Sequence, residues 1–119
     1  MITYQVEKYH EIKAEIQALW QDHWEEVALD KDVIKLDPDY NTYQVLSETN
    51  VLHTVTVREE GKVIGYHMSL IHTHLHYKSS LTAFTDIFFI SKEKRKGFVG
   101  IKLLKFMEES LKAKGVQKI

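Results

Sequence analysis

The stretch from Leu81 to Ile119 constrains the fold most, because it predicts a strand, a basic turn, a helix and a further strand in close succession. Residues 81–90 (LTAFTDIFFI) are apolar and rich in β-forming side chains, and residues 116–119 begin another apolar segment. Residues 101–114 carry apolar side chains at helical spacing, and Gly115 suits the position after a helix end because glycine accepts a positive φ. Two strands connected through a helix lie parallel in one sheet, so this stretch predicts a sheet covered by a helix.

The turn Ser91–Gly100 (SKEKRKGFVG) has the composition of a pyrophosphate-binding loop. The first turn of a helix has backbone N–H groups without intrahelical partners, and the helix dipole favours negative charge there. A phosphate group satisfies both preferences. Basic side chains add long-range attraction for a polyanion; they are Lys92, Lys94, Arg95 and Lys96. The alternative is a plain solvated turn, because basic turns that contain glycine are common.

The remaining segments predict one α+β domain with a mixed α/β sheet over residues 1–119. We expect strands at 2–6, 51–58, 63–77 and 81–90, and helices at 10–29 and 98–114. Turns at 59–62 and 78–80 connect the central strands, and the long strand between them bends at Gly65. The resulting order is βα(α)βββαβ, with three consecutive antiparallel strands.

Residues 30–50 allow two interpretations. A short helix from Pro38 to Leu46 would have Asp37 as its N-cap and Pro38 in its first turn. A solvated loop is the other interpretation. Tyr40 and Tyr43 near Asp37 and Asp39 suggest a surface that binds a cationic acceptor amine, to which a solvated loop without such a role is the alternative.

The composition argues against several classes of protein. The formal net charge of -1 provides no global attraction for nucleic acid, so we expect no nucleic-acid partner. The absence of cysteine excludes a disulfide scaffold and a cysteine nucleophile, and it fits a reducing cytoplasm. No apolar run reaches the roughly 20 residues of a membrane helix, and the N-terminus lacks the features of a secretory signal. We therefore expect a cytoplasmic protein without a membrane partner.

Residues 86–104 resemble motif A of the GCN5-related N-acetyltransferases (GNAT superfamily), which reads Gln/Arg-x-x-Gly-x-Gly/Ala between a strand and a helix. Arg95 and Gly100 match its first and last positions. Phe98 stands where the family has its middle glycine, and Gly97 lies one residue earlier. The middle glycine normally permits close approach of the backbone to the pyrophosphate, so this departure bears directly on cofactor binding.

The Arg-Lys-Gly-x-x-Gly form is similar to that of small bacteriophage-encoded acetyltransferases, as are His74–Tyr77, Thr85–Asp86 and His23–Val27. The resemblance covers nearly the whole chain and implies a single GNAT-like domain with motif A at 81–115. If the protein is phage-encoded, its cytoplasm is that of the host. Proteins of the family normally continue with the rest of the fifth strand, a helix and a hairpin, and this part often supplies a tyrosine general acid. The chain is therefore either a fragment or a natural short form, and a partner chain that completes the sheet would make a homodimer.

The resemblance implies an acetyl-CoA-dependent N-acetyltransferase, in which a small-molecule or protein amine attacks the acetyl group directly. In the family, backbone groups at the end of the fourth strand hold the pantetheine arm, and the turn binds the pyrophosphate. The positions that correspond to acetyl-CoA contacts are Phe88, Phe89, Ile90, Arg95, Lys96, Gly97, Phe98, Val99, Gly100 and Ile101. The helix at 10–29 borders the acceptor in the family, which implicates Trp24 and Glu25 or Glu26; for the tryptophans, Trp20 and Trp24, core packing is the alternative.

Asp86, His74 and His76 are the candidate catalytic residues. Asp86 lies two and four residues before Phe88 and Ile90, so a regular strand places these three on one face. A carboxylate desolvated on an apolar strand suits proton abstraction; a hydrogen-bonded carboxylate at a strand end is the alternative. His74 and His76 share a face of the predicted strand with His72, as a proton acceptor or a wall of the acceptor groove. Three histidines at this spacing span over ~13 Å, so they cannot ligate one ion, and we expect no metal site.

The main alternative to an enzyme is a catalytically inactive GNAT-fold module that binds a host or phage protein. CoA binding without turnover of any amine would favour that module. A nucleic-acid binder would show salt-dependent binding, against which the net charge argues.

Overall fold

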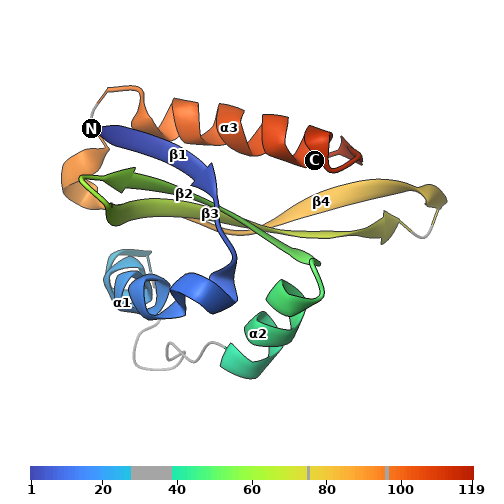
Figure 1. The fold of residues 1–119 in the computed structure, drawn as a ribbon, viewed down its shortest axis with the longest axis horizontal. Coiled ribbons are helices and arrows are strands. Elements are labelled where there is room, and N and C mark those ends of the chain that lie inside the picture. Colours follow the sequence, from blue (N-terminus) through green and yellow to red (C-terminus); the bar gives the residue numbers. More distant parts are fainter. Residues whose placement is uncertain (28–38, 75, 96) are drawn as a thin grey trace.

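A mixed sheet separates one helix from two others (Figure 1). The computed structural model describes residues 1–27, 39–74, 76–95 and 97–119, and at 22, 24–27, 74, 77 and 78 it describes the backbone alone. Within these residues the sheet has the order β1-β2-β3-β4-β5. Strands β4 and β5 are parallel, and all other neighbouring strands are antiparallel. The predicted α+β class and the order βα(α)βββαβ are therefore confirmed.

The elements lie close to their predicted positions. The strands are β1 (Ile2–Val6), β2 (Leu52–Glu59), β3 (Lys62–His74), β4 (Tyr77–Ile90) and β5 (Val116–Lys118). The helices are α1 (Tyr9–Val27), α2 (Tyr40–Glu48), α3 (Val99–Ala113) and the short 3-10 helix η1 (Lys92–Lys94). Gly115 follows α3 with a φ of 91°, as predicted for a residue after a helix end. None of the described helices is long and apolar enough to cross a membrane.

The β2–β3 hairpin turns where the sequence predicts. Glu60 and Gly61 both have positive φ, which is the backbone of a two-residue hairpin turn. A β-bulge follows at Ile64, next to the predicted bend at Gly65. A Cβ atom at Gly65 would lie 2.8 Å from the Phe89 carbonyl oxygen, so glycine here lets β4 approach closely.

The β3–β4 hairpin differs from the prediction. β3 ends at His74, which pairs with Tyr77 in β4, so the predicted strand through 77 and the turn at 78–80 are wrong. Residues 78–80 instead form an irregularity in β4, between the pairs His74–Tyr77 and Thr73–Leu81. Serines favour turns, but these positions contain neither glycine nor proline to force one, and the ladder continues past them.

Helix α2 corrects the interpretation of residues 40–48 as a solvated loop. Its N-cap is Asp39, whose carboxylate accepts a hydrogen bond from the Thr42 N–H (3.1 Å). Hydrogen bonds from the side chain and backbone of Thr42 hold the pKa of Asp39 below its usual value. Asp39 therefore takes the place of the predicted cap Asp37, which, with Pro38, lies outside the described residues.

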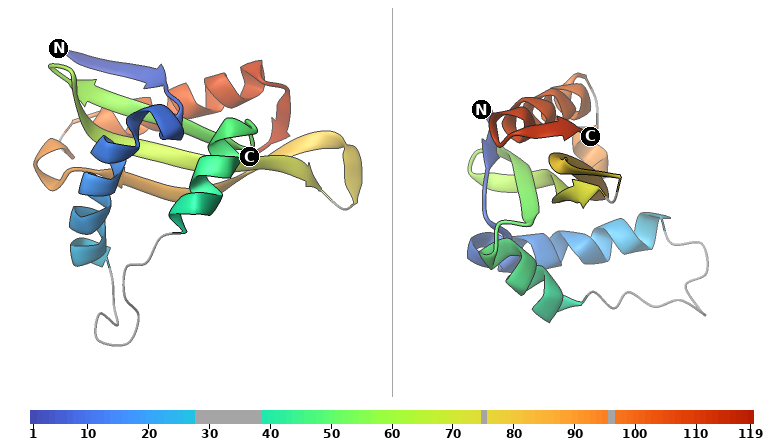
Figure 2. Two further views of the ribbon diagram at one scale, coloured as in Figure 1. Left: turned by 60° about the horizontal axis from the view of Figure 1, so that its bottom comes forward. Right: turned by 90° about the vertical axis from the view of Figure 1, so that its right-hand side faces the viewer.

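Helix α3 covers one face of the sheet, and α1 and α2 cover the other (Figure 2). Each face has its own hydrophobic core. The α1–α2-side core contains Tyr9, Ile16, Leu19, Trp20, Leu52, Val63, Tyr66, Met68 and Phe89. The α3-side core contains Val55, Val57, Ile64, Ala83, Ile90, Leu103, Met107, Leu111 and Val116. Trp20 is thus a core residue, and each helix layer buries one face of the sheet.

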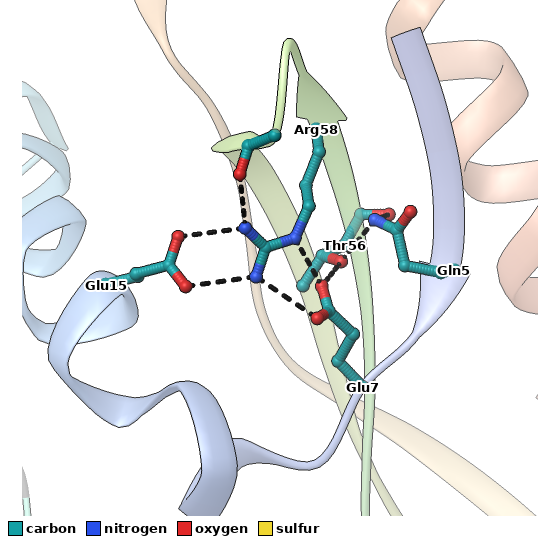
Figure 3. Close-up of polar contacts among 6 residues, drawn as sticks. Gln5, Glu7, Glu15, Thr56 and Arg58 are labelled. Carbon is teal, nitrogen blue, oxygen red and sulfur yellow. Dashed lines mark hydrogen bonds and ion pairs between the residues drawn. The ribbon is translucent and has the colours of Figure 1, made fainter.

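A charged cluster around Arg58 fastens α1 to the sheet (Figure 3). The guanidinium donates to both oxygens of Glu7 (2.9 and 3.1 Å) and to both oxygens of Glu15 (3.0 and 3.0 Å). It also donates to the Gly61 carbonyl (2.6 Å). These bidentate contacts connect β2, the β2–β3 turn, the β1–α1 connection and α1.

Candidate active site

A β-bulge at Asp86 determines which side chains at the end of β4 face α3 and which face α1 and α2. Thr85 pairs with Ser69 and Ile87 pairs with Met68, so Asp86 is an extra residue without a direct partner in β3. Side chains alternate between the two faces of a strand, and one extra residue shifts this alternation. After the bulge, each side chain of β4 therefore lies on the face of the sheet opposite to the one that simple alternation predicts.

The packing on either side of the bulge shows this reversal. Ala83 belongs to the α3-side core, whereas Ile87 and Phe89, which simple alternation would put on the same face, pack in the α1–α2-side core. Ile90 packs in the α3-side core, and Asp86 contacts α2. The prediction that Asp86 shares a face with Ile90 is therefore wrong, because the sequence does not show the inserted residue.

Asp86 is exposed at the surface and bonded to a tyrosine of α2. The Tyr43 hydroxyl donates to Asp86 Oδ2 (2.5 Å). Burial and this hydrogen bond raise the pKa of Tyr43, so its hydroxyl remains a donor at neutral pH. The burial on which the general-base argument depended is not found, since Asp86 is open to solvent. Asp86 is hydrogen-bonded, as in the alternative, but it lies at a bulge inside β4 and not at a strand end, so its candidacy as a base rests on its position two residues before Phe88.

Aromatic rings fix the position of Tyr43. Its ring centroid lies 5.6 Å from that of Tyr9 and 5.0 Å from that of Trp20, and both of these residues are buried. Tyr40, one helical turn earlier, stacks on Trp20 at 5.9 Å. The sequence placed Tyr43 near acidic residues of its own segment, but its partner Asp86 comes from β4, which the sequence alone could not show.

A second aromatic group lies at the end of β4. The His23 ring stacks on Phe89 (centroids 4.7 Å apart), and its Nδ1 lies 3.4 Å from the Tyr66 hydroxyl. Burial raises the pKa of Tyr66 above its usual value. Tyr66 was not singled out by the sequence, because an aromatic residue in a β-strand is an ordinary core residue. Trp24, Glu25 and Glu26 follow His23, and their side chains lie outside what the structure describes.

Strand β5 covers only the beginning of the outer edge of β4. Among the described residues, β5 pairs with β4 at Leu81 and Thr82. Near the other end of β4, the Ser91 N–H donates to the Ile64 carbonyl in β3 (2.8 Å). A trans peptide has its C=O and N–H on opposite sides, so the Ile90 carbonyl points to the outer edge.

The backbone alternation of a strand extends this conclusion along the edge. Residues whose N–H and C=O both point outward alternate with residues that bond to the neighbouring strand. Phe88 and Ile90 therefore face the outer edge, whereas Phe89 faces β3. The Ile90 carbonyl accepts a hydrogen bond from Arg95 Nε (2.8 Å), which leaves the Phe88 groups and the Ile90 N–H toward the open edge.

The turn after β4 leads into α3 as the sequence predicts. Gly97 has a φ of 76°, a backbone conformation that residues with a Cβ atom rarely adopt. Phe98 is the N-cap of α3 without a side-chain cap bond, and 69% of its surface is exposed. The N–H groups of Val99, Gly100 and Ile101 form the first turn, where no intrahelical acceptor is available.

Gly100 is not required by packing. A Cβ atom there would have its nearest neighbour, Ile90 Cδ1, at 3.5 Å, which is an ordinary contact. Its φ is also unremarkable, so alanine fits the fold. The space beside this first helical turn is therefore available to a ligand that approaches the backbone.

The basic side chains of the turn differ in their partners. Lys94 forms an ion pair with Glu59 of β2 (2.5 Å), which raises the pKa of this lysine. Arg95 bonds the Ile90 carbonyl and lies over the Phe89 ring, with Cζ 5.5 Å from the centroid. Lys92 is exposed, and Lys96 lies outside the described residues. Two of the predicted cations thus also anchor the turn to the sheet.

The candidate catalytic histidines are not brought to Asp86. His74 ends β3, and at the ~3.3 Å rise of a strand its separation from Met68, beside the bulge, is roughly 20 Å. His76 is exposed between β3 and β4, where the hairpin projects beyond α1 and α2 (Figure 1). His72 stacks on Phe84, 4.6 Å between centroids. The predicted histidine face therefore belongs to the far end of the hairpin, and the described residues include no group of three metal ligands.

Two other histidines, which sequence reasoning missed, are buried beneath α3. His53 Nε2 lies 2.8 Å from Ser110 Oγ, and His67 Nε2 lies 3.2 Å from Thr85 Oγ1. Burial, followed by the charge of Lys114 and the His67 ring, lowers the pKa of His53 to about 4. Burial also lowers the pKa of His67. Their positions in alternating apolar strands are the one signal that could have found them.

Solved structures of acetyltransferases share this fold. An aminoglycoside acetyltransferase from an uncultured soil metagenomic sample matches with a TM-score of 0.77 at 14% identity, over 100% of this chain and 77% of that one. A predicted acetyltransferase with acetyl-CoA from Clostridium acetobutylicum matches with a TM-score of 0.74 at 13% identity, over 100% and 79%. Ribosomal-protein-alanine N-acetyltransferase from Brucella melitensis biovar Abortus 2308 matches with a TM-score of 0.73 at 10% identity, over 99% and 77%.

These similarities show that the chain has the GNAT acyl-CoA N-acyltransferase fold. No protein-family model matches the sequence, and no curated protein does either.

Proposed function

We propose that this chain is an acetyl-CoA-dependent N-acetyltransferase of the GNAT superfamily, with an amine as its acceptor. The observation that carries the proposal is the outward-facing backbone of Phe88 and Ile90 in β4 beside the first turn of α3. In one chain, this arrangement offers backbone groups to an extended amide-bearing arm and free N–H groups to a pyrophosphate. Acetyl-CoA has both chemical features, and a solved structure with the same fold contains it.

The pyrophosphate would lie against the N–H groups of residues 97–101, where the helix dipole and free donors favour an anion. Lys92 and Arg95 would contribute a smaller, screened attraction. The pantetheine amides would pair with the outward groups of Phe88 and Ile90, in the manner of an added strand. Of the predicted cofactor residues that the structure describes, this assignment retains all except Phe89, which has a packing role because its backbone faces β3.

In the proposed reaction, Asp86 accepts one proton from the acceptor ammonium. The neutral nitrogen then attacks the acetyl carbonyl carbon, the C–N bond forms and the C–S bond breaks. The second proton leaves the nitrogen for the CoA sulfur, and Asp86 returns its proton to solvent. Asp86 lies two residues before Phe88, at the bulge where the edge of β4 turns toward α2.

Isothermal titration with acetyl-CoA tests the cofactor assignment. Gly100→Ala should reduce the affinity by about tenfold or more, because the added methyl group occupies the space that the phosphates need. Lys92→Ala should reduce it by about threefold at most, because an exposed charge is screened. The Tm of unliganded Gly100→Ala should match that of wild type, since the added Cβ has only an ordinary contact.

If titration of the wild-type protein with acetyl-CoA shows no heat of binding, both the cofactor assignment and the proposed enzymatic activity are contradicted. Equal affinities for wild type and Gly100→Ala would remove the proposed pyrophosphate position. Binding without release of CoA to any amine would leave a CoA-binding module in place of an enzyme.

A further inference from the structure

Among the described residues, only one oxygen of the Asp86 carboxylate has a hydrogen-bond partner. Its Oδ2 accepts the Tyr43 hydroxyl, and within the described part of the chain Oδ1 has no hydrogen-bond partner and no cation lies paired with it. A carboxylate oxygen at the surface is a good acceptor of a charge-assisted hydrogen bond from an ammonium group. One oxygen is therefore held by the protein while the other is open to a ligand.

Tyr43 is a rigid holder for this carboxylate. The Asp39 cap begins α2 one turn before Tyr43, and the tyrosine ring packs against both Tyr9 and Trp20. On the opposite face of β4, His67 bonds Thr85, the residue that precedes the bulge. The bulge is thus held from both faces of the sheet, which fixes the direction of Asp86.

Phe84 adds exposed apolar surface on the same side of the sheet as Asp86. Phe84 lies two residues before Asp86, pairs with Leu70 of the α1–α2-side face, and leaves 43% of its surface exposed. The Phe84 ring stacks on His72, so its exposed part offers apolar contact to an alkyl stem, and the carboxylate offers a charge-assisted hydrogen bond to an ammonium group. A primary alkylammonium group combines the positive charge and the short apolar stem that this surface can bind.

We infer that Tyr43 is a positioning residue, which holds Asp86 Oδ2 so that Oδ1 receives the primary alkylammonium group of the acceptor. This inference rests on the proposed function and adds to it the residue that orients the base. Tyr43 itself does not exchange a proton, because its hydroxyl only donates to Oδ2. The proton of the ammonium passes to Oδ1, as in the reaction described above.

Titration of ¹⁵N-labelled protein with n-butylammonium chloride tests the inference at constant ionic strength, with n-pentanol as the neutral probe of similar shape. Saturable amide shifts should centre on residues 84–88 with the ammonium and be absent with the alcohol. Asp86→Asn should weaken the ammonium affinity by about tenfold or more, and Tyr43→Phe by about three- to tenfold. Tyr40→Phe, which removes a hydroxyl from the same helix, should leave the affinity unchanged.

A double-mutant cycle separates positioning from general destabilisation. Tyr43→Phe should have no further effect on the affinity in the Asp86→Asn background, because the hydroxyl acts through the carboxylate. Equal effects of Tyr43→Phe in both backgrounds, equal shifts with n-pentanol, or no saturable shift would each overturn the inference. Acetyl-CoA titration of the same samples keeps the two proposals apart: failure of acetyl-CoA to bind contradicts the proposed function, whereas loss of the ammonium shifts with acetyl-CoA binding intact contradicts only this inference.

Discussion

At the scale of single residues, Asp86 is where local sequence and function diverge most. It sits in a segment of strand-forming residues, yet as a bulge residue it points to Tyr43 and solvent instead of alternating with its neighbours. Asp86→Asn should lower the turnover of an amine acceptor by about 100-fold while it changes the acetyl-CoA affinity by less than about threefold, because it removes a proton acceptor and no cofactor contact. Steady-state kinetics together with isothermal titration measure the two effects. Parallel loss of both, or loss of neither, would contradict the role of Asp86 as base.

At the scale of elements, the Arg58 cluster holds α1 against the sheet (Figure 3). Helix α1 in turn supports Tyr43 through Trp20. Arg58→Met leaves Glu7 and Glu15 without their shared cation, and we expect a loss of about 2 kcal/mol in the free energy of unfolding. Chemical denaturation measures it. Lys94→Met, which breaks a single half-exposed ion pair, is the matched control and should cost less. A larger effect of the control would show that the bidentate cluster contributes little.

At the scale of the whole molecule, His53 and His67 connect stability to pH through the layer beneath α3. Burial lowers both pKa values, to about 4 for His53, so the fold keeps these rings neutral while the unfolded chain binds protons below pH ~6.5. Stability should therefore fall as pH drops from ~6.5 toward 4, by up to about 1.4 kcal/mol per pH unit for each extra proton. Urea unfolding over this range should show a shallower fall for His53→Asn. His72→Asn, at an exposed site, should keep the wild-type slope. An unchanged slope in His53→Asn would refute the link.

Much of the fold and part of the candidate site could be predicted from the sequence, because they depend on neighbours along the chain. The hairpin turn at Glu60 and Gly61, the positive φ of Gly115, and the strand–turn–helix path through Gly97 and Gly100 follow from local conformational preferences. The free N–H groups at the start of α3 belong to any helix end. The predicted pyrophosphate loop therefore remains a prediction that rests on local geometry.

The tertiary structure decided the features that depend on pairing between strands and packing between layers. The register of β3 against β4 inserts Asp86 as a bulge, reverses the faces of Ile87 and Phe89, and moves His74 to the far end of the hairpin. The bulge cannot be predicted from the sequence alone, because it is defined by the pairing with β3. The alternation of residues along β4 looks the same whether or not each residue has a partner in β3. The Tyr43–Asp86 bond joins residues that are distant in the chain and depends on how α2 packs on the sheet. What the sequence determined by itself was the strands, the helices α1 and α3 and a helix end that suits an anion. It left α2 open, and which side chains of different elements meet was settled only by long-range packing.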